Sequence, residues 1–211
     1  MPSGSKLPEA SKSTPPPKGV PGGGFPMRYN LATTTHMPPT QRPPANEYAP
    51  FYHRYLAELP DADVLELMRS QEHVLSKLPA AVPPSAEDFA YAPGKWTVRQ
   101  VVGHLGDTER VFGYRALRIS RGDLTPLPGF EENDYVANSS SASRPLHDLV
   151  GELTLLRGAN LHLFSTLDPD SWLHVGVANS HPVSVRALAF IIVGHAEHHL
   201  RILRDRYHID C

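Results

Sequence analysis

The segment SVRALAFIIVGHAEHHLRILRDRY, residues 184–207, decides the fold class. Its apolar side chains recur every three or four positions, which is the spacing of one face of an α-helix. This face consists of Val185, Leu188, Ile192, His195, His199 and Ile202. Two imidazoles therefore stand where leucine is expected, about one helical turn apart on the same face. The segment predicts a helix that carries two histidines into the protein core.

Three further segments have the same helical periodicity. They cover about 64–78, 97–122 and 143–167. The second opens at Thr97, whose T-x-x-Q sequence has the form of a capping box. Four long amphipathic helices without a clear strand predict an all-α fold, a four-helix bundle.

The links between these helices are long. Residues 79–96 and 122–142 each provide about twenty residues, whereas neighbouring helices of a simple bundle need only about 2–8. We therefore expect at least one long crossover link that crosses the bundle or covers one end of it. The second link contains the acidic and aromatic sequence PGFEENDY at 128–135.

The N-terminal region differs in composition from the rest of the chain. Of the 22 prolines, 12 fall in the first 50 residues, together with a Gly-Gly-Gly run. Such a composition buries too little apolar area to offset the entropy of ordering. We predict a disordered Pro-rich tail over 1–46 and the bundle over 47–211, with a translation start at Met27 or Met37 as an alternative origin of the tail.

Charge and cysteine content exclude several classes of protein. The net charge of −2 gives no basic surface for nucleic acid, and no apolar run reaches the roughly 18 residues of a membrane span. The single cysteine, Cys211, excludes a disulfide scaffold. We therefore expect a cytoplasmic protein without nucleic-acid or membrane partners.

A third inward histidine is expected on the second helix, where His104 shares the apolar side with Val101 and Thr108. Together with His195 and His199 it can form a three-nitrogen site for one divalent metal ion with an open coordination position. The alternative is a buried cluster of hydrogen-bonded imidazoles, which is costly to satisfy. The donor type suits Zn first, and Ni, Co, Mn or Cu also fit.

Neighbouring polar residues have less certain roles. Glu197 does not directly follow His195, so the H-E-x-x-H pattern of zinc proteases is absent. His198 lies off the stripe and competes only weakly as a ligand. Asp107, three residues after His104, is the candidate catalytic residue, because a carboxylate there can orient His104, accept a proton or ligate the metal. An ordinary surface acid is the alternative.

At these residues the sequence resembles the DinB-like superfamily of metal-dependent four-helix bundles, which includes the bacillithiol and mycothiol S-transferases. The matching motifs are PGKWTVRQVVGHLGDTER at 93–110, the acidic-aromatic stretch at 128–136 and GHAEHH at 194–199. The resemblance covers about 60–207. It implies metal ligands at the three inward histidines, an open metal site and a homodimer, but it implies no particular substrate.

The function expected from these observations is that of a metal-dependent S-transferase, which joins a low-molecular-weight thiol to an electrophilic small molecule. A hydrolase that activates water at the same site is one alternative. A non-catalytic, stress-linked metal-binding bundle is another. Trp96, Phe130 and Tyr135 are candidates for the walls of the pocket.

Overall fold

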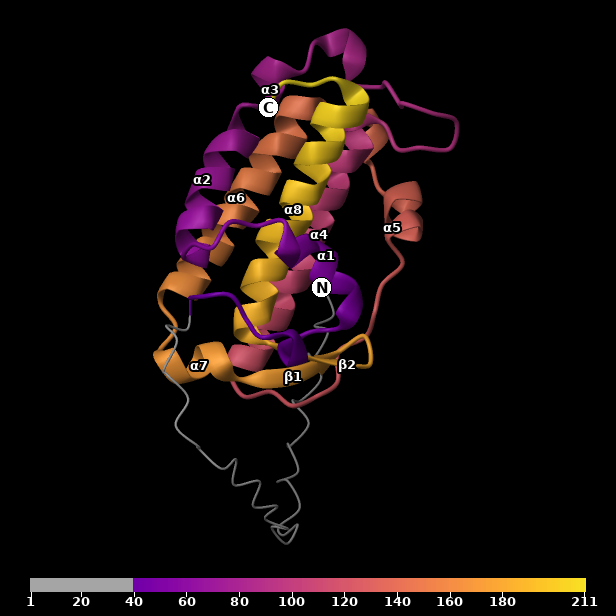
Figure 1. Ribbon diagram of the computed structural model, residues 1–211. Coiled ribbons are helices and arrows are strands. Elements are labelled where there is room, and N and C mark those ends of the chain that lie inside the picture. Colours follow the sequence, from indigo (N-terminus) through magenta and orange to yellow (C-terminus); the bar gives the residue numbers. More distant parts are fainter. Residues whose placement is uncertain (1–39) are drawn as a thin grey trace, which may run out of the picture. The chain divides into compact units, whose positions relative to one another are not determined.

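The computed structural model describes residues 40–211, and its four long helices form a bundle (Figure 1). They are α2 (Val64–Ser76), α4 (Val98–Ser120), α6 (Leu146–Ser165) and α8 (Val185–Tyr207). The prediction of an all-α four-helix bundle is confirmed. None of the helices in the described part of the chain is long and apolar enough to cross a membrane.

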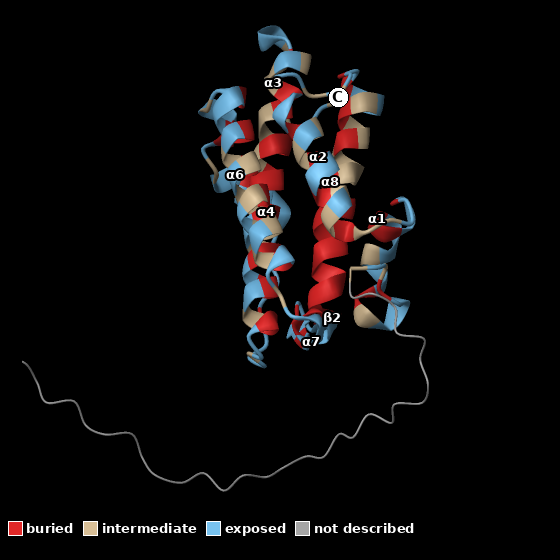
Figure 2. Cartoon of the chain, turned by 90° about the vertical axis from the view of Figure 1, so that its left-hand side faces the viewer, coloured by how far each residue is buried: buried red, intermediate tan, exposed pale blue. Residues whose placement is uncertain are grey.

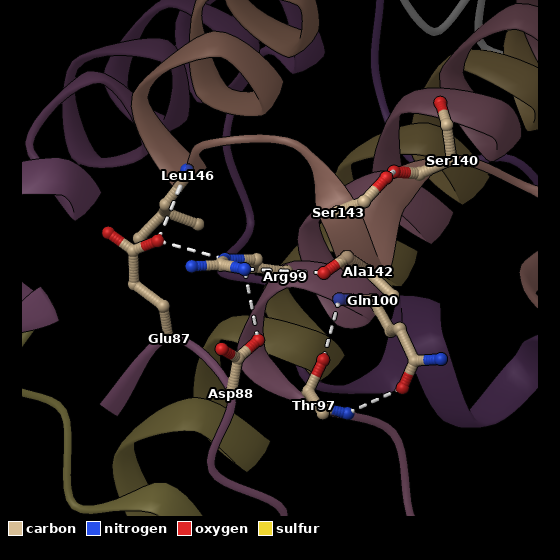
Figure 3. Close-up of polar contacts among 9 residues, drawn as sticks. All are labelled: Glu87, Asp88, Thr97, Arg99, Gln100, Ser140, Ala142, Ser143 and Leu146. Atoms are coloured by element: carbon tan, nitrogen blue, oxygen red, sulfur yellow. Dashed lines mark hydrogen bonds and ion pairs between the residues drawn. The ribbon is translucent and has the colours of Figure 1, made fainter. Parts of the chain in front are cut away.

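Side-chain caps fix where the helices begin. Asp63 accepts a hydrogen bond from the backbone N–H of Leu65 at 2.8 Å, which starts α2. At the start of α4, Thr97 Oγ1 accepts from the Gln100 N–H at 3.3 Å and Gln100 Oε1 accepts from the Thr97 N–H at 2.9 Å (Figure 3). Ser184 caps α8 in the same manner. These caps satisfy backbone donors that would otherwise lack partners.

The direction of each helix follows from the two apolar clusters of the core. One cluster joins the end of α2 and of α8 to the beginning of α4 and of α6, through Leu75, Leu203, Val98 and Leu146. The other cluster joins the opposite four ends. Helices α4 and α6 are therefore parallel to each other and antiparallel to α2 and α8.

This arrangement of parallel and antiparallel helices requires long connections. Each of α2 and α4 packs against both α6 and α8, so α2 and α4 are diagonal neighbours. The link between them, with α3 (Leu78–Ala81) and a 3-10 turn, crosses one end of the bundle. The link from α4 to α6 returns along the outside of the bundle and includes α5 (Glu132–Asn138) (Figure 1). The predicted crossover links are confirmed.

Arg99, in the first turn of α4, joins both links at this end (Figure 3). Its guanidinium pairs with Glu87 at 2.9 Å and with Asp88 at 3.1 Å, and it donates to the Ala142 carbonyl at 3.2 Å. Glu87 also accepts from the Leu146 N–H at 3.4 Å. These contacts hold the starts of α4 and α6 together.

A β-hairpin that the sequence analysis did not predict precedes α8. Helix α7 (Pro169–Leu173) leads into the antiparallel strands β1 (Val175–Ala178) and β2 (His181–Ser184). Asn179 and Ser180 form its turn with φ values of 50° and 64°, as a two-residue hairpin requires. Strands of four residues are too short for an alternating pattern to be recognised in the sequence.

The N-terminal boundary of the bundle also differs from the prediction. Of the predicted tail, residues 1–39 lie outside the described part of the chain, but residues 40–46 contact the bundle. Arg42 donates to the backbone carbonyls of Leu56 and Leu59, and the Thr40 carbonyl accepts from Val64 at 3.0 Å. The boundary at residue 47 is therefore too late, because a proline count does not reveal single side chains that bind backbone groups.

The segment from residue 45 to the start of α2 packs against α8. It contains two 3-10 turns, Ala45–Glu47 and Pro50–Tyr52, followed by α1 (His53–Ala57). Helix α8 is covered by this segment as well as by α2 and α4, and its first half is buried on all sides (Figure 2). The histidines of α8 begin where this fully buried half ends.

Candidate metal centre

Three histidines converge between α4 and α8. His104 comes from the first half of α4, whereas His195 and His199 occupy successive turns of α8. Each contributes a ring nitrogen, and the three nitrogens lie within 4.8 Å of one another. His104 and His195 are buried, and His199 is largely buried. The structure thus brings together all three predicted metal ligands.

The distances suit one metal ion. The Nε2 atoms of His104 and His195 are 3.1 Å apart. Two nitrogens bound to a single tetrahedral zinc ion at its usual distances lie about 3.3 Å apart. A purely hydrogen-bonded cluster is less satisfactory, because among the described residues the hydrogen bond between His104 and His195 leaves His199 outside it. The donor set therefore fits a divalent cation.

The protonation state of the cluster also suits metal binding. Burial lowers the pKa of His104 to about 4. Burial lowers the pKa values of His195 and His199 well below their usual range, and repulsion from the neighbouring imidazoles adds to this effect. All three rings are consequently neutral at pH 7, which is the form that coordinates metal ions.

Aromatic rings enclose the cluster. The centroid of the Trp96 ring lies 4.7 Å from that of His104 and 6.3 Å from that of His199, almost parallel to the latter. Tyr55 of α1 packs edge-on against His195, with 5.6 Å between centroids. Trp96 therefore forms a wall of the site, as predicted, and Tyr55 forms a second wall that the sequence did not reveal.

Two hollows lead to the histidines from different sides. One, of about 310 Å³, is lined by Trp96 and His199. The other, of about 170 Å³, is lined by His104 and His195 and extends along α4. Phe130 lines the second hollow as predicted. Tyr135 packs against Phe130, with 5.1 Å between the centroids, and lies in an adjoining hollow instead.

Glu132, at the start of α5, lines both hollows. It is the only acidic residue among those that line either of them. The sequence analysis noted the acidic and aromatic stretch around it but did not single it out. Its place at the site depends on the path of the α4–α6 link, which periodicity does not predict.

Asp107 lies elsewhere. It lines a third hollow, of about 290 Å³, with Gly103, Arg110 and Glu152, and none of the three histidines lines this hollow. Burial raises the pKa of the Asp107 carboxyl, and Arg110 opposes the rise. Residues three apart on a helix differ by about 60° in direction. The structure therefore does not bring the candidate catalytic carboxylate together with the metal ligands.

The remaining polar residues of the closing motif do not contribute to the three convergent nitrogens. Glu197 accepts hydrogen bonds from Arg204 at 2.6 Å and from Gln71 at 3.4 Å. His198 packs against Tyr55, with 5.1 Å between ring centroids, and contributes no nitrogen to the convergent group. Both residues surround the site without joining the ligand set.

Comparison with known proteins supports this description of the fold. Among solved structures, YfiT from Bacillus subtilis, described as a probable metal-dependent hydrolase with an unusual four-helix bundle topology, superposes with a TM-score of 0.58. The two sequences are 22% identical over 82% of this chain and 100% of YfiT. No curated protein sequence matches the chain significantly. The sequence model of the DinB superfamily matches residues 67–203, which include all three histidines, and the chain therefore belongs to the DinB superfamily.

Proposed function

We propose that this protein is a metal-dependent S-transferase that joins a low-molecular-weight thiol to an electrophilic small molecule. The observation that carries the proposal is the convergence of three buried, neutral imidazoles next to two hollows. Three protein nitrogens leave at least one coordination position of a zinc ion for a substrate. The imidazole donors support Zn first, then Ni and Co, whereas Mn, which favours oxygen ligands, fits them least.

When bound, a divalent cation would supply positive charge that lowers the pKa of a thiol or of water at the open position. Different residues of this chain hold the ion, exclude water and admit the substrates around the open coordination position. His104, His195 and His199 hold the ion in a fixed place. Trp96 and Tyr55 exclude water from one side of the rings. The two hollows admit the thiol and the electrophile.

The position of Asp107 favours a thiol over water as the nucleophile. A free thiol has a pKa of about 8.5, compared with about 15.7 for water, so a thiol ionises near neutral pH with little help from a base. Water requires more help, and the carboxylate predicted to provide it lines a separate hollow. With Asp107 in a separate hollow, a thiol is the better nucleophile for this site than water.

A hydrolase is the second candidate, and Glu132 is the observation in its favour. Its carboxylate lines both hollows that reach the histidines, so it is placed to accept a proton from a nucleophile in either one. YfiT is described as a probable metal-dependent hydrolase, but the low sequence identity carries only the fold to this chain.

The test separates these functions. The purified protein is first analysed for bound metals and is then supplied with several cellular thiols and a chromogenic electrophile, and separately with chromogenic esters and amides. We expect thiol-dependent turnover that disappears in His195→Ala. Ester hydrolysis that disappears in Glu132→Gln, without thiol-dependent turnover, would favour the hydrolase.

Full metal occupancy without turnover in either assay would favour the non-catalytic metal-binding bundle. Gel filtration with light scattering tests the homodimer, which stays a prediction.

A further inference from the structure

Arg115 is a buried cation beside the candidate metal centre. Its exposed fraction is only 3%, although it lies on a helix at the edge of the bundle. It lines the 170 Å³ hollow together with His104, Thr108 and Phe112, which share one face of α4 at spacings of four, four and three residues. The Arg115 side chain therefore forms part of the wall of this hollow, farther along α4 than His104.

The partners of Arg115 leave its charge uncompensated. Its Nη2 donates to the Pro128 carbonyl at 2.7 Å, and its Cζ atom lies 5.5 Å from the centroid of Phe112 and 5.9 Å from that of Phe130. No carboxylate in residues 40–211 lies within ion-pair distance of it. Burial lowers the pKa of Arg115, and Tyr52 is the strongest opposing influence.

The two other buried arginines of the described residues, Arg157 and Arg186, are each paired with a glutamate, as are several exposed ones. On the same helix, Arg110 pairs with Glu152 and Arg118 pairs with Asp123. The fully buried Arg157 of α6 pairs with a glutamate at 2.8 Å. A buried charge normally requires such a partner, because the loss of hydration is otherwise uncompensated. At Arg115 the missing partner would have to come from outside residues 40–211.

The hollow suits an anion. Arg54 also lines it and adds a second positive charge, and Glu132 is its only acidic lining residue. A guanidinium binds a carboxylate through two parallel hydrogen bonds, which gives both affinity and orientation.

The position of Arg115 is fixed by the hairpin. The Leu127 N–H donates to the Val177 carbonyl at 2.9 Å, and the Asn179 N–H donates to the Leu127 carbonyl at 3.0 Å, so the link containing Pro128 is tied to β1. A Cβ atom on Gly129 would lie 2.3 Å from the Asn179 side-chain oxygen, so the two segments are in close contact. The carbonyl that orients Arg115 is therefore held by a rigid support.

We propose that Arg115 binds the carboxylate of a small-molecule substrate whose reactive group lies at the three histidines. This inference rests on the proposed function for the place of the reactive group. The Phe112 ring lies 6.3 Å from the His195 ring and 5.5 Å from the Arg115 Cζ atom, so the guanidinium is within about 12 Å of the His195 ring. The substrate class is thus a carboxylic acid whose carboxylate lies up to about 12 Å from the reacting atom.

Binding to the metal-free protein tests this proposal. Octanoate and octanamide have the same length and differ in charge, and their affinities are measured by calorimetry at pH 8 in the presence of a chelator. We expect octanoate to bind roughly tenfold or more tightly than octanamide, because hydrogen bonds to a charged group discriminate by that amount. The preference should disappear in Arg115→Met and persist in Arg118→Met, which removes a charge from the same helix outside the hollow.

Equal affinities for the two probes in the wild type, or an unchanged preference in Arg115→Met, would overturn the proposal. A second readout covers the case in which Arg115→Met does not fold. In wild-type protein with labelled arginine, the Arg115 side-chain NMR signal should move with octanoate and stay in place with octanamide, and its failure to move would equally overturn the proposal. These measurements need neither metal nor turnover, so they fail or succeed independently of S-transfer.

Discussion

His104 and His195 approach each other to 3.1 Å between their Nε2 atoms, across the contact of α4 and α8, although they are 91 residues apart in the chain. The contact joins two neutral rings that have few other polar partners. The distance matches that between two ligands of one shared ion.

Alanine at any of the three histidines should remove most of the bound metal. His104→Ala, His195→Ala and His199→Ala each delete one of the three convergent nitrogens. His198→Ala is the matched control and should retain most of the metal, since a supporting residue changes affinity by only about 10–100-fold. Elemental analysis of the purified variants provides the measurement. Full occupancy in His195→Ala would contradict the site.

Removal of the metal should lower the melting temperature. A ligand that binds only the folded state stabilises it by about 2.7 kcal/mol when its free concentration is 100 times its dissociation constant. We therefore expect excess chelator to lower the melting temperature of the wild type. The triple variant of His104, His195 and His199 should show no such change. An equal shift in both proteins would mean that the chelator acts elsewhere.

The metal-free protein should become less stable as the pH falls from 6.5 to about 4. Above pH 6.5 the His104 imidazole is neutral in both the folded and the unfolded chain. Below it the unfolded chain gains a proton, whereas burial keeps the folded imidazole neutral until about pH 4. At pH 5 His104 alone should lower the free energy of unfolding by about 2 kcal/mol.

Urea unfolding of chelator-treated protein at pH 8, 6 and 5 checks this expectation. In His104→Leu the free energy of unfolding should fall less between pH 8 and pH 5 than in the wild type, and the difference is the contribution of His104. An identical pH dependence in the variant and the wild type would show that other groups cause the loss.

The sequence predicted features that depend on one helix at a time. The register of α8 placed His195 and His199 inward, and the register of α4 did the same for His104. The three-residue separation of Asp107 from His104 predicted that the carboxylate lies near the site. The two side chains differ by about 60° in direction around α4, so Asp107 lines another hollow. Glu132 was overlooked because only the folded path of the α4–α6 link brings it to the histidines.

The N-terminal boundary provides a further prediction. Glu47 accepts hydrogen bonds from Ser184 at 2.6 Å and from Arg186 at 3.1 Å, at the start of α8. Glu47→Ala would leave the largely buried Arg186 without a counter-charge, and we expect it to lower the free energy of unfolding by about 2–3 kcal/mol. The exposed Glu66 is the control, and Glu66→Ala should cost about 0.5 kcal/mol or less. Equal small losses would show that the segment before α1 contributes little.

Gly194 sets how closely α1 approaches the histidines. A Cβ atom added there would lie 2.6 Å from the backbone oxygen of Tyr55, a distance that forces α1 or α8 to move. Because the Tyr55 ring covers His195, this movement should open one wall of the site. We expect Gly194→Ala to lower the free energy of unfolding by about 1–3 kcal/mol and to weaken metal binding.

The control is Gly151→Ala on α6, where an added Cβ atom has nothing within 4 Å. Alanine in an open helix interior is more favourable than glycine by about 0.5–1 kcal/mol, so this variant should be slightly more stable than the wild type. Urea unfolding and metal titration of both variants provide the comparison. If Gly194→Ala were as stable as Gly151→Ala and bound metal equally well, the packing of α1 against α8 would not be what closes the site around His195.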